Sequence, residues 1–68
     1  MNKNEQLKQW YRDADRSRRY YLREQLETKY DMSRMQFLHR KAGRTPLSKM
    51  ECEAIENILE ENIFDITQ

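Results

Sequence analysis

Apolar side chains recur at the spacing of an α-helix along most of this 68-residue chain. Leu22 and Leu26 lie four residues apart, and Ile55, Ile58 and Leu59 repeat the same period further along. Side chains spaced in this way line one face of a helix. The whole sequence has one glycine and one proline, so it has little of the punctuation that strands and tight turns need. The pattern therefore predicts an all-α fold.

Start and stop signals divide the chain into four helices. Ser33 and Ser48 are each followed three residues later by a residue that can complete a capping box, Gln36 and Glu51. Gly43 can adopt the left-handed conformation after a last helical turn, so it marks the end of the third helix. The predicted elements are helices at about 4–13, 17–30, 33–42 and 48–62, followed by a short extended tail at 63–68.

The same spacing predicts which side chains are buried. The third helix is expected to turn Phe37, Leu38 and Ala42 inward. Cys52 is expected to be a buried thiol and not a redox centre, since neighbouring glutamates disfavour its thiolate. Four aromatic residues are expected to pack between helices and not to stack on bases, with at least one of them exposed: Trp10, Tyr11, Tyr20 and Tyr21.

The composition limits the chain to one small domain. Apolar and charged residues each make up 37% of the sequence, which is too polar for a membrane span but enough for one thin core. The first residues lack the apolar block of a secretion signal. The single cysteine and the single histidine can form neither an internal disulfide nor a four-ligand zinc site. We therefore expect a cytoplasmic protein with no cofactor and no contact with a membrane.

Catalysis is not expected from this sequence. It shows no pairing of a nucleophile with a base, no paired carboxylates in an apolar setting and no glycine-rich loop for phosphate. The sequence accordingly predicts no catalytic residue and no small-molecule substrate, which leaves binding as the expected function.

Charge is segregated along the chain. Residues 1–46 hold twelve lysines and arginines against six acidic residues, whereas residues 47–68 hold one against six. Residues 32–46 contain no acidic residue, and their basic residues are Arg34, His39, Arg40, Lys41 and Arg44. A nucleic-acid duplex would therefore meet a purely cationic edge in this segment.

A resemblance to a known family covers residues 22–46, which read LREQLETKYDMSRMQFLHRKAGRTP. This segment resembles the helix-turn-helix of phage-repressor-like bacterial regulators, in which a supporting helix, a tight turn, a serine-capped recognition helix and a closing glycine follow in that order. The matching positions are Leu22 and Leu26 in the supporting helix, Met32 and Phe37 around the start of the recognition helix, Ser33 as its cap and Gly43 as its closing glycine. The resemblance implies a four-helix domain whose third helix enters the major groove of DNA.

Two positions depart from the family's pattern. Asp31 stands where the family usually has glycine in the turn, and aspartate tolerates the left-handed conformation. Glu27 stands where the family usually has a small alanine in the supporting helix. A carboxylate that faced the crossing helix would lose its hydration. We therefore expect either a wider crossing of the two helices or an ion pair from Glu27 to Arg40 or Lys41.

The exposed positions of the third helix and the arginines of the second are the candidates for DNA contacts. Arginine can bond O6 and N7 of guanine together, and glutamine can do the same with N6 and N7 of adenine. The candidates for reading bases are Arg34, Gln36, His39 and Arg40. The candidates for binding phosphates are Arg18, Arg19, Arg23, Lys41, Arg44 and Thr45. Two alternatives stay open, in which the arginines of the second helix are merely solvated and His39 is an ordinary surface residue.

The sequence thus predicts sequence-specific binding of double-stranded DNA by a small transcriptional regulator of bacterial or phage type. One short helix reads few base pairs, so two copies on half-sites about 34 Å apart are expected. The expected contact of this homodimer is the apolar part of the tail, Ile63, Phe64 and Ile66. The competing prediction is a protein-interaction module, such as an adaptor or an antitoxin-like protein, that uses the acidic fourth helix and the tail.

Overall fold

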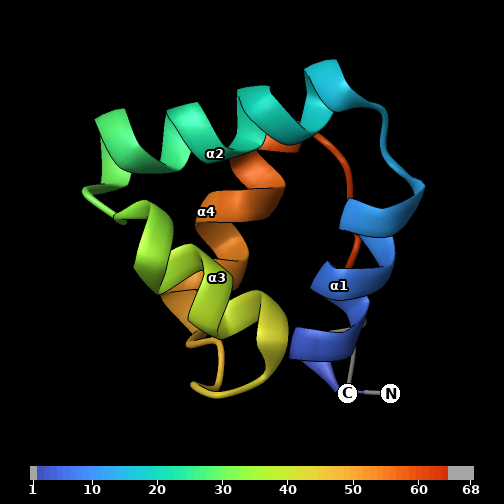
Figure 1. The fold of residues 1–68 in the computed structure, drawn as a ribbon, viewed down its shortest axis with the longest axis vertical. Helices are drawn as coiled ribbons and strands as arrows, with labels where there is room; N and C mark the ends of the chain where they lie inside the picture. The colour runs from blue at the N-terminus through green and yellow to red at the C-terminus, as the bar shows by residue number, and fades with distance from the viewer. Residues whose placement is uncertain (1, 65–68) are drawn as a thin grey trace.

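The computed structural model describes residues 2–64. These residues form four α-helices and the segments that connect and flank them (Figure 1). The helices are α1 (Lys3–Asp13), α2 (Arg16–Tyr30), α3 (Arg34–Ala42) and α4 (Lys49–Leu59). No strand occurs in this range, so the predicted all-α fold is confirmed. Within it, no helix combines the length and the apolar composition needed to cross a lipid bilayer. The predicted boundaries of the first three helices agree with the structure to within one residue.

Every helix begins at a residue whose side chain accepts a hydrogen bond from the backbone of the first turn. These N-caps are Asn2, Asp15, Ser33 and Ser48. The two serine-capped boxes predicted from the sequence are present, with Gln36 and Glu51 each accepting a bond at 2.9 Å from the backbone N–H of their serine. Asn2 and Glu5 form a third box, which the sequence analysis missed. Such caps satisfy N–H groups that have no partner within the helix.

The links on either side of α3 depend on left-handed residues. Asp31, with φ 57°, ends α2 and begins the three-residue link to α3, and Gly43, with φ 85°, ends α3. Both residues therefore do what the sequence predicted of them. In Figure 1 the short link makes α3 leave α2 at a steep angle.

The fourth helix is shorter than predicted. α4 ends at Leu59 and not at residue 62, because Glu60 turns into the left-handed conformation with φ 57°. Its N–H donates to the carbonyl oxygen of Glu56 at 2.8 Å, which closes the last turn. An apolar stripe continuing to residue 63 suggested a longer helix, but it did not reveal this turn.

The segment after α4 folds back onto the core. The Glu56 carboxylate accepts hydrogen bonds from the backbone N–H of Ile63 at 3.1 Å and of Phe64 at 3.0 Å. Phe64 is only 4% exposed and belongs to the core, and Ile63 packs against it. Of the predicted tail, residues 65–68, including Ile66, lie outside the described residues.

One core holds the four helices together. α2 runs across the top of Figure 1 with α1, α3 and α4 beneath it, and α1 packs on α3 while α2 packs on α3 and α4. The buried cluster comprises Leu7, Leu22, Leu26, Met32, Phe37, Leu47, Cys52, Ala54, Ile55, Ile58 and Phe64. The cluster includes every apolar residue that the family resemblance placed at a buried position, and it includes Cys52, as expected.

α3 turns a different face to the core than the sequence predicted. Phe37 is buried, but Ala42 is exposed and Leu38 is only half-buried. On a helix, positions 40 and 41 continue the stripe of position 37, whereas position 42 lies about 140° away from it. Arg40 and Lys41 occupy that stripe and are half-buried. Long cationic side chains can do this because their hydrocarbon stems pack while their charged ends reach a partner.

The aromatic residues divide into two pairs. Trp10 and Tyr11 on α1 pack against the core, with the Tyr11 ring centroid 5.6 Å from that of Phe37. Tyr20 and Tyr21 are exposed on α2 and do not belong to the core. The expectation that at least one of the four is exposed is thus confirmed, while the expectation of packing between helices holds for Trp10 and Tyr11 alone. Tyr20 and Tyr21 fall outside the stripe of buried leucines on α2, and helical spacing alone did not decide between the two faces.

Replacing Glu56 with alanine tests how the segment after α4 is held. Glu56→Ala removes the acceptor of two part-buried backbone N–H groups, so we expect the free energy of unfolding to fall by about 2 kcal/mol, measured by urea denaturation. Glu53→Ala is the matched control, because Glu53 is exposed on the same helix and its loss should cost less than about 0.5 kcal/mol. Equal effects of the two substitutions would contradict this role of Glu56.

Candidate nucleic-acid interface

The side of α3 that points away from the core is open to solvent. Met35 is 63% exposed, Ala42 is exposed, and Leu38 and His39 are half-buried. These four residues share one side of the helix because of their spacing, and we call them the outer face of α3. Arg34, the first residue of the helix, is exposed beside them. A ligand can therefore reach both the outer face and Arg34.

A shallow hollow of about 430 Å³ lies between this outer face and α1. Its lining includes three lysines and arginines, Lys8 on α1, Lys41 on α3 and Arg44 just after α3, together with His39. None of the described residues that line the hollow is acidic. Charges of a single sign around a hollow attract ions of the opposite sign, so the site suits an anion.

Asn4 fixes the position of α1 against the end of α3. Its side-chain amide donates to the carbonyl oxygen of Arg40 at 2.6 Å and to that of Thr45 at 2.9 Å. These two bonds hold the residues on either side of Gly43 to α1. Thr45, a predicted phosphate contact, is half-buried at this junction. Asn4 thus determines how Lys8 lies relative to Arg44.

Arg40 and Lys41 both have partners within the molecule, although Lys41 also lines the hollow. The Arg40 Nε donates to a Glu51 carboxylate oxygen at 3.0 Å, and the two side chains are 18% and 21% exposed. The Lys41 ammonium lies 4.4 Å from the centroid of the Tyr11 ring. Arg40, predicted to read bases, therefore fastens α3 to α4 and lies outside the outer face. Glu27 is exposed on α2, so its carboxylate is not desolvated against the crossing helix, and Arg40 pairs with Glu51 instead of with Glu27.

Gln36 and Arg34 differ in what their side chains already do. The Gln36 carbonyl oxygen accepts from the backbone N–H of Ser33 at 2.9 Å. In the predicted double hydrogen bond to adenine, the side-chain oxygen of Gln36 accepts from N6 and its side-chain nitrogen donates to N7. The capping box already engages that oxygen and restrains the orientation of the amide group. Arg34 is exposed at the helix start, where its guanidinium can turn toward a ligand. Of the predicted base readers, Arg34 and Gln36 are exposed and His39 is half-buried, but Gln36 is held by the capping box.

The arginines of α2 hold other parts of the chain. Arg18 donates to a Glu61 carboxylate oxygen at 2.7 Å and lies 5.4 Å from the centroid of the Trp10 ring. Arg19 donates to the carbonyl oxygens of Tyr11 at 2.7 Å and of residue 12 at 3.1 Å. Both therefore bridge α2 to α1 or to the segment after α4. Arg23, the third predicted phosphate contact on this helix, is half-buried.

Two contributors to the hollow were missed by the sequence analysis. Lys8 belongs to α1, and only the packing of α1 on α3 brings it beside Arg44. Met35 was detectable in principle, because it lies opposite Phe37 on a helical projection. The projection places Met35 on the outside only if Arg40 and Lys41 face inward. Sequence reasoning does not suggest this, because lysine and arginine are mostly exposed in proteins.

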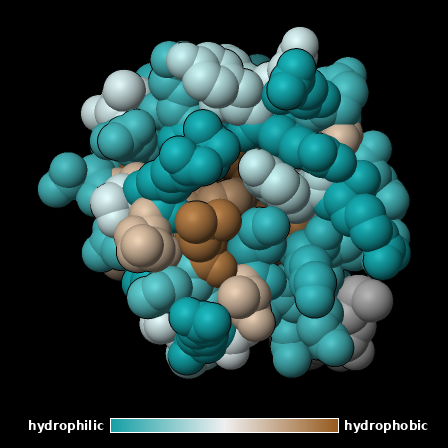
Figure 2. Space-filling view, in the orientation of Figure 1, coloured by the Kyte–Doolittle hydropathy of each residue, from teal (hydrophilic) through white to brown (hydrophobic). Residues whose placement is uncertain are grey.

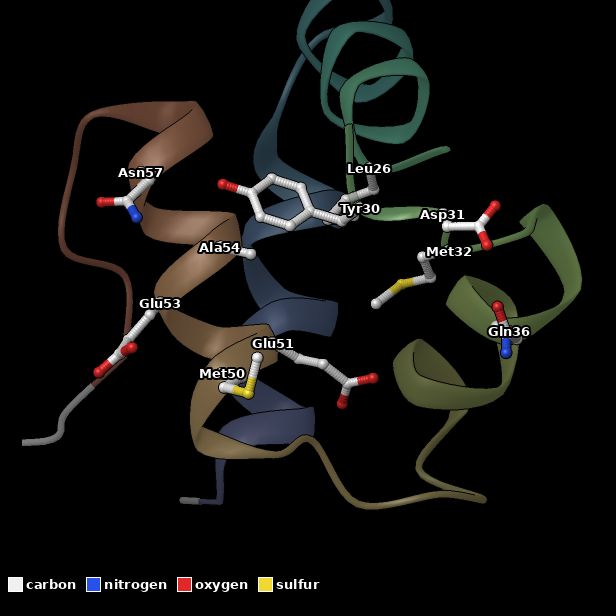
Figure 3. Close-up of a pocket in the computed structure, with 10 residues that line it drawn as sticks. All are labelled: Leu26, Tyr30, Asp31, Met32, Gln36, Met50, Glu51, Glu53, Ala54 and Asn57. Atoms are coloured by element: carbon white, nitrogen blue, oxygen red, sulfur yellow. The ribbon is translucent and has the colours of Figure 1, made fainter. Parts of the chain in front are cut away.

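A second cleft, of about 370 Å³, lies between the end of α2, the start of α3 and α4 (Figure 3). Its lining includes the exposed apolar or aromatic residues Met50 and Tyr30 and the acidic residues Asp31, Glu51 and Glu53. In Figure 3 the Met50 and Glu51 side chains project from α4 on the side of the cleft opposite Met32. This cleft is acidic where the hollow beside α3 is basic.

Cys52 is a buried free thiol. Burial raises the pKa of the Cys52 thiol, so the thiol stays protonated and unreactive. Within residues 2–64, no three histidine, cysteine, aspartate or glutamate side chains gather closely enough to hold a metal ion.

Comparison with known proteins finds no matching family model, no similar curated protein and no similar solved structure. The assignment of a function therefore depends on the residues and their geometry.

The Arg18 and Glu61 pair can be followed through the chain's single tryptophan. The hydrogen bond from Arg18 holds the pKa of the Glu61 carboxyl below its usual value, and the bond from the Trp10 indole at 3.1 Å adds to this effect. A carboxyl with a lowered pKa stabilises the fold at higher pH, and this stabilisation is lost as the pH falls through its folded-state pKa. We expect Arg18→Ala to raise the pH of the acid transition in Trp10 fluorescence.

Arg16→Ala is the control for this titration, because Arg16 is an exposed arginine near Arg18 on the same helix. It should leave the transition where it is in the parent protein. A transition that is unmoved by Arg18→Ala would show that Arg18 does not set the ionisation of Glu61.

Proposed function

We propose that this chain binds double-stranded DNA in a sequence-specific manner, as a small transcriptional regulator, with the outer face of α3 in the major groove. The observation that carries the proposal is the basic hollow beside α3, to which Lys8, Lys41 and Arg44 contribute and in whose described lining no acid occurs. A duplex presents closely spaced phosphates on both sides of a groove that is wide enough for a helix. Cations at the edges of an exposed helix match that arrangement.

Base reading is assigned to Arg34 and His39 in this proposal. Arg34 stands at the start of α3, where the recognition helix of a helix-turn-helix contacts base edges. Its guanidinium can bond O6 and N7 of guanine together. His39 lies five residues further along α3, about 140° around the helix axis from Arg34, so the two side chains would reach different base pairs. Gln36 and Arg40 contribute indirectly, since one caps α3 and the other ties it to α4.

Phosphate binding is assigned to side chains that border the hollow. Arg44 is exposed just after α3 and Lys8 is exposed on α1, so both can reach the backbone beside the groove. Lys41 lines the same hollow, with its ammonium above the Tyr11 ring. Arg18 and Arg19 are engaged elsewhere. We therefore expect about four phosphate contacts, with Arg23 or Thr45 as the fourth.

A homodimer on two half-sites remains part of the proposal. Phe64, one of the tail residues predicted to form its contact, is buried in the core of its own chain. Ile63 packs against that core, and Ile66 lies outside the described residues. We therefore propose that the other apolar residues of the tail, Ile63 and Ile66, form the dimer contact.

The cleft beside α4 favours a second candidate function, a protein-interaction module. Met50 is 80% exposed at its edge, and acidic residues stand around it. An apolar cleft with an acidic rim suits a partner segment that carries an apolar side chain flanked by lysine or arginine. On this candidate, Met50→Glu would impair the function, whereas on the DNA-binding proposal it leaves the affinity for a duplex unchanged.

Salt dependence tests the DNA-binding proposal. With about four phosphate contacts, the slope of log K against log salt should be near −3.6 for B-DNA, at about −0.9 per contact. Arg44→Ala should make this slope shallower by about 0.9 and weaken binding to all sequences alike, as measured by fluorescence anisotropy with a labelled duplex. Arg16→Ala, at the end of α2 far from α3 (Figure 1), should change neither. Absence of salt-sensitive binding would refute the proposal.

Arg34→Ala tests the assignment of base reading. On the duplex that the parent protein prefers, selected from a random pool, the loss should be about 1 to 3 kcal/mol, and on unrelated sequences it should be small. Arg44→Ala provides the contrast, since a phosphate contact carries no sequence information. A uniform loss for Arg34→Ala on every duplex would instead make Arg34 a phosphate contact.

A further inference from the structure

The outer face of α3 carries hydrocarbon at its centre. Met35, Leu38 and Ala42 follow one another at helical spacing, and all three line the hollow. Figure 2 shows a hydrophobic patch over the position of α3 in the middle of a largely hydrophilic face. The hollow's cations come from Lys8, Lys41 and Arg44. The surface is thus apolar in the middle and cationic at its edges.

This arrangement is the reverse of an ordinary surface helix. In α3 the stripe facing the core contains Arg40 and Lys41 beside Phe37, whereas Met35 and Ala42 are exposed. Leaving apolar side chains in water forgoes the free energy that their burial would give. Such a face gains most from a ligand that offers apolar groups in the middle and anions on either side.

The major groove of DNA offers this combination. Each thymine presents a C5-methyl group there, and phosphates border the groove on both sides. Met35 and Ala42 are separated by seven residues, or about 10 Å along the helix axis, which is about three base-pair steps at 3.4 Å. The apolar stripe is therefore long enough to meet methyl groups on about three successive base pairs.

We infer that Met35, Leu38 and Ala42 are specificity-determining residues that contact thymine methyl groups, so that the preferred site contains A·T pairs where the middle of α3 lies. This inference rests on the proposed binding of DNA and adds a second kind of base reading to that of Arg34. Apolar contact with the thymine methyl distinguishes thymine from cytosine without a hydrogen bond. The cations at the edges of the stripe favour the polyanionic duplex over an uncharged partner surface.

Replacing thymine with deoxyuracil tests the inference, because the exchange removes the methyl group and keeps every hydrogen-bonding atom. The probe is the duplex that the parent protein prefers after selection from a random pool, synthesised with each thymine replaced in turn. At the positions that face α3, each replacement should weaken binding about fourfold, the equivalent of about 0.8 kcal/mol for one apolar carbon. Replacements outside about three adjacent base pairs should have no effect.

Two variants connect the methyl effect to this stripe. Met35→Ala, at a largely exposed position, should reduce the thymine preference at one position, and Leu38→Ala should reduce it at another. Met50→Ala is the matched control, because Met50 is an exposed methionine in the other cleft, and it should keep the full preference. Arg44→Ala should bind more weakly and still prefer thymine over uracil.

The outcomes separate the inference from the proposed function. Salt-sensitive binding that treats thymine and uracil alike at every position would overturn the inference and leave DNA binding in place. A thymine preference that survives both Met35→Ala and Leu38→Ala would also overturn it. Absence of binding to any duplex would overturn the inference together with the proposed function, and would direct attention to a protein partner for the stripe.

Discussion

The stripe of α3 that faces the core combines the aromatic side chain of Phe37 with two cations, Arg40 and Lys41. The rotation of α3, and with it the outer face, depends on the partners that these two cations find inside the molecule. Phe37 alone is too little to set the rotation of a nine-residue helix. Arg40 completes the contact by its bond to Glu51, and Lys41 does so above the Tyr11 ring. Because these residues point inward, the helix must present Met35 and its neighbours to solvent.

The segregation of charge along the sequence gains a structural meaning from these contacts. The acidic C-terminal part supplies Glu51 and Glu61, which pair with Arg40 and Arg18 from the basic part. The Arg18–Glu61 pair is exposed, and such a pair contributes only about 0 to 1 kcal/mol. The Arg40–Glu51 pair is half-buried and fixes the orientation of α3 against α4. The carboxylates balance the charges of the paired arginines, and the basic character of the hollow comes from a different set that includes Lys8 and Arg44.

Local signals in the sequence predicted most of the fold. The capping boxes of α3 and α4 and the left-handed Gly43 depend on residues a few positions apart, so the sequence alone reveals them. The placement of Ile63 and Phe64 on the core involves the Glu56 carboxylate reaching forward to backbone that is seven and eight residues away, which no short-range rule encodes.

The candidate site was harder to predict for the same reason. The basic residues at 32–46 identify the segment around α3 as cationic. They do not show which of these cations face the core and which face solvent. Arg40 needed Glu51 from another helix to face inward, and Lys8 needed α1 to pack on α3 before it could join the hollow. Tertiary contacts therefore decide which basic residues are available to bind a ligand. The sequence alone shows only which residues are basic.

The central claim is that the outer face of α3, and not the acidic cleft, is the binding surface for DNA. Titration of the isotope-labelled protein with a duplex, followed by NMR, tests it most directly. If the outer face of α3 binds DNA, the amide signals of Met35, His39, Arg44 and Lys8 shift together and saturate, while those of Met50 and Asn57 stay in place. Shifts centred on the cleft beside α4, or no shifts at all, would contradict it.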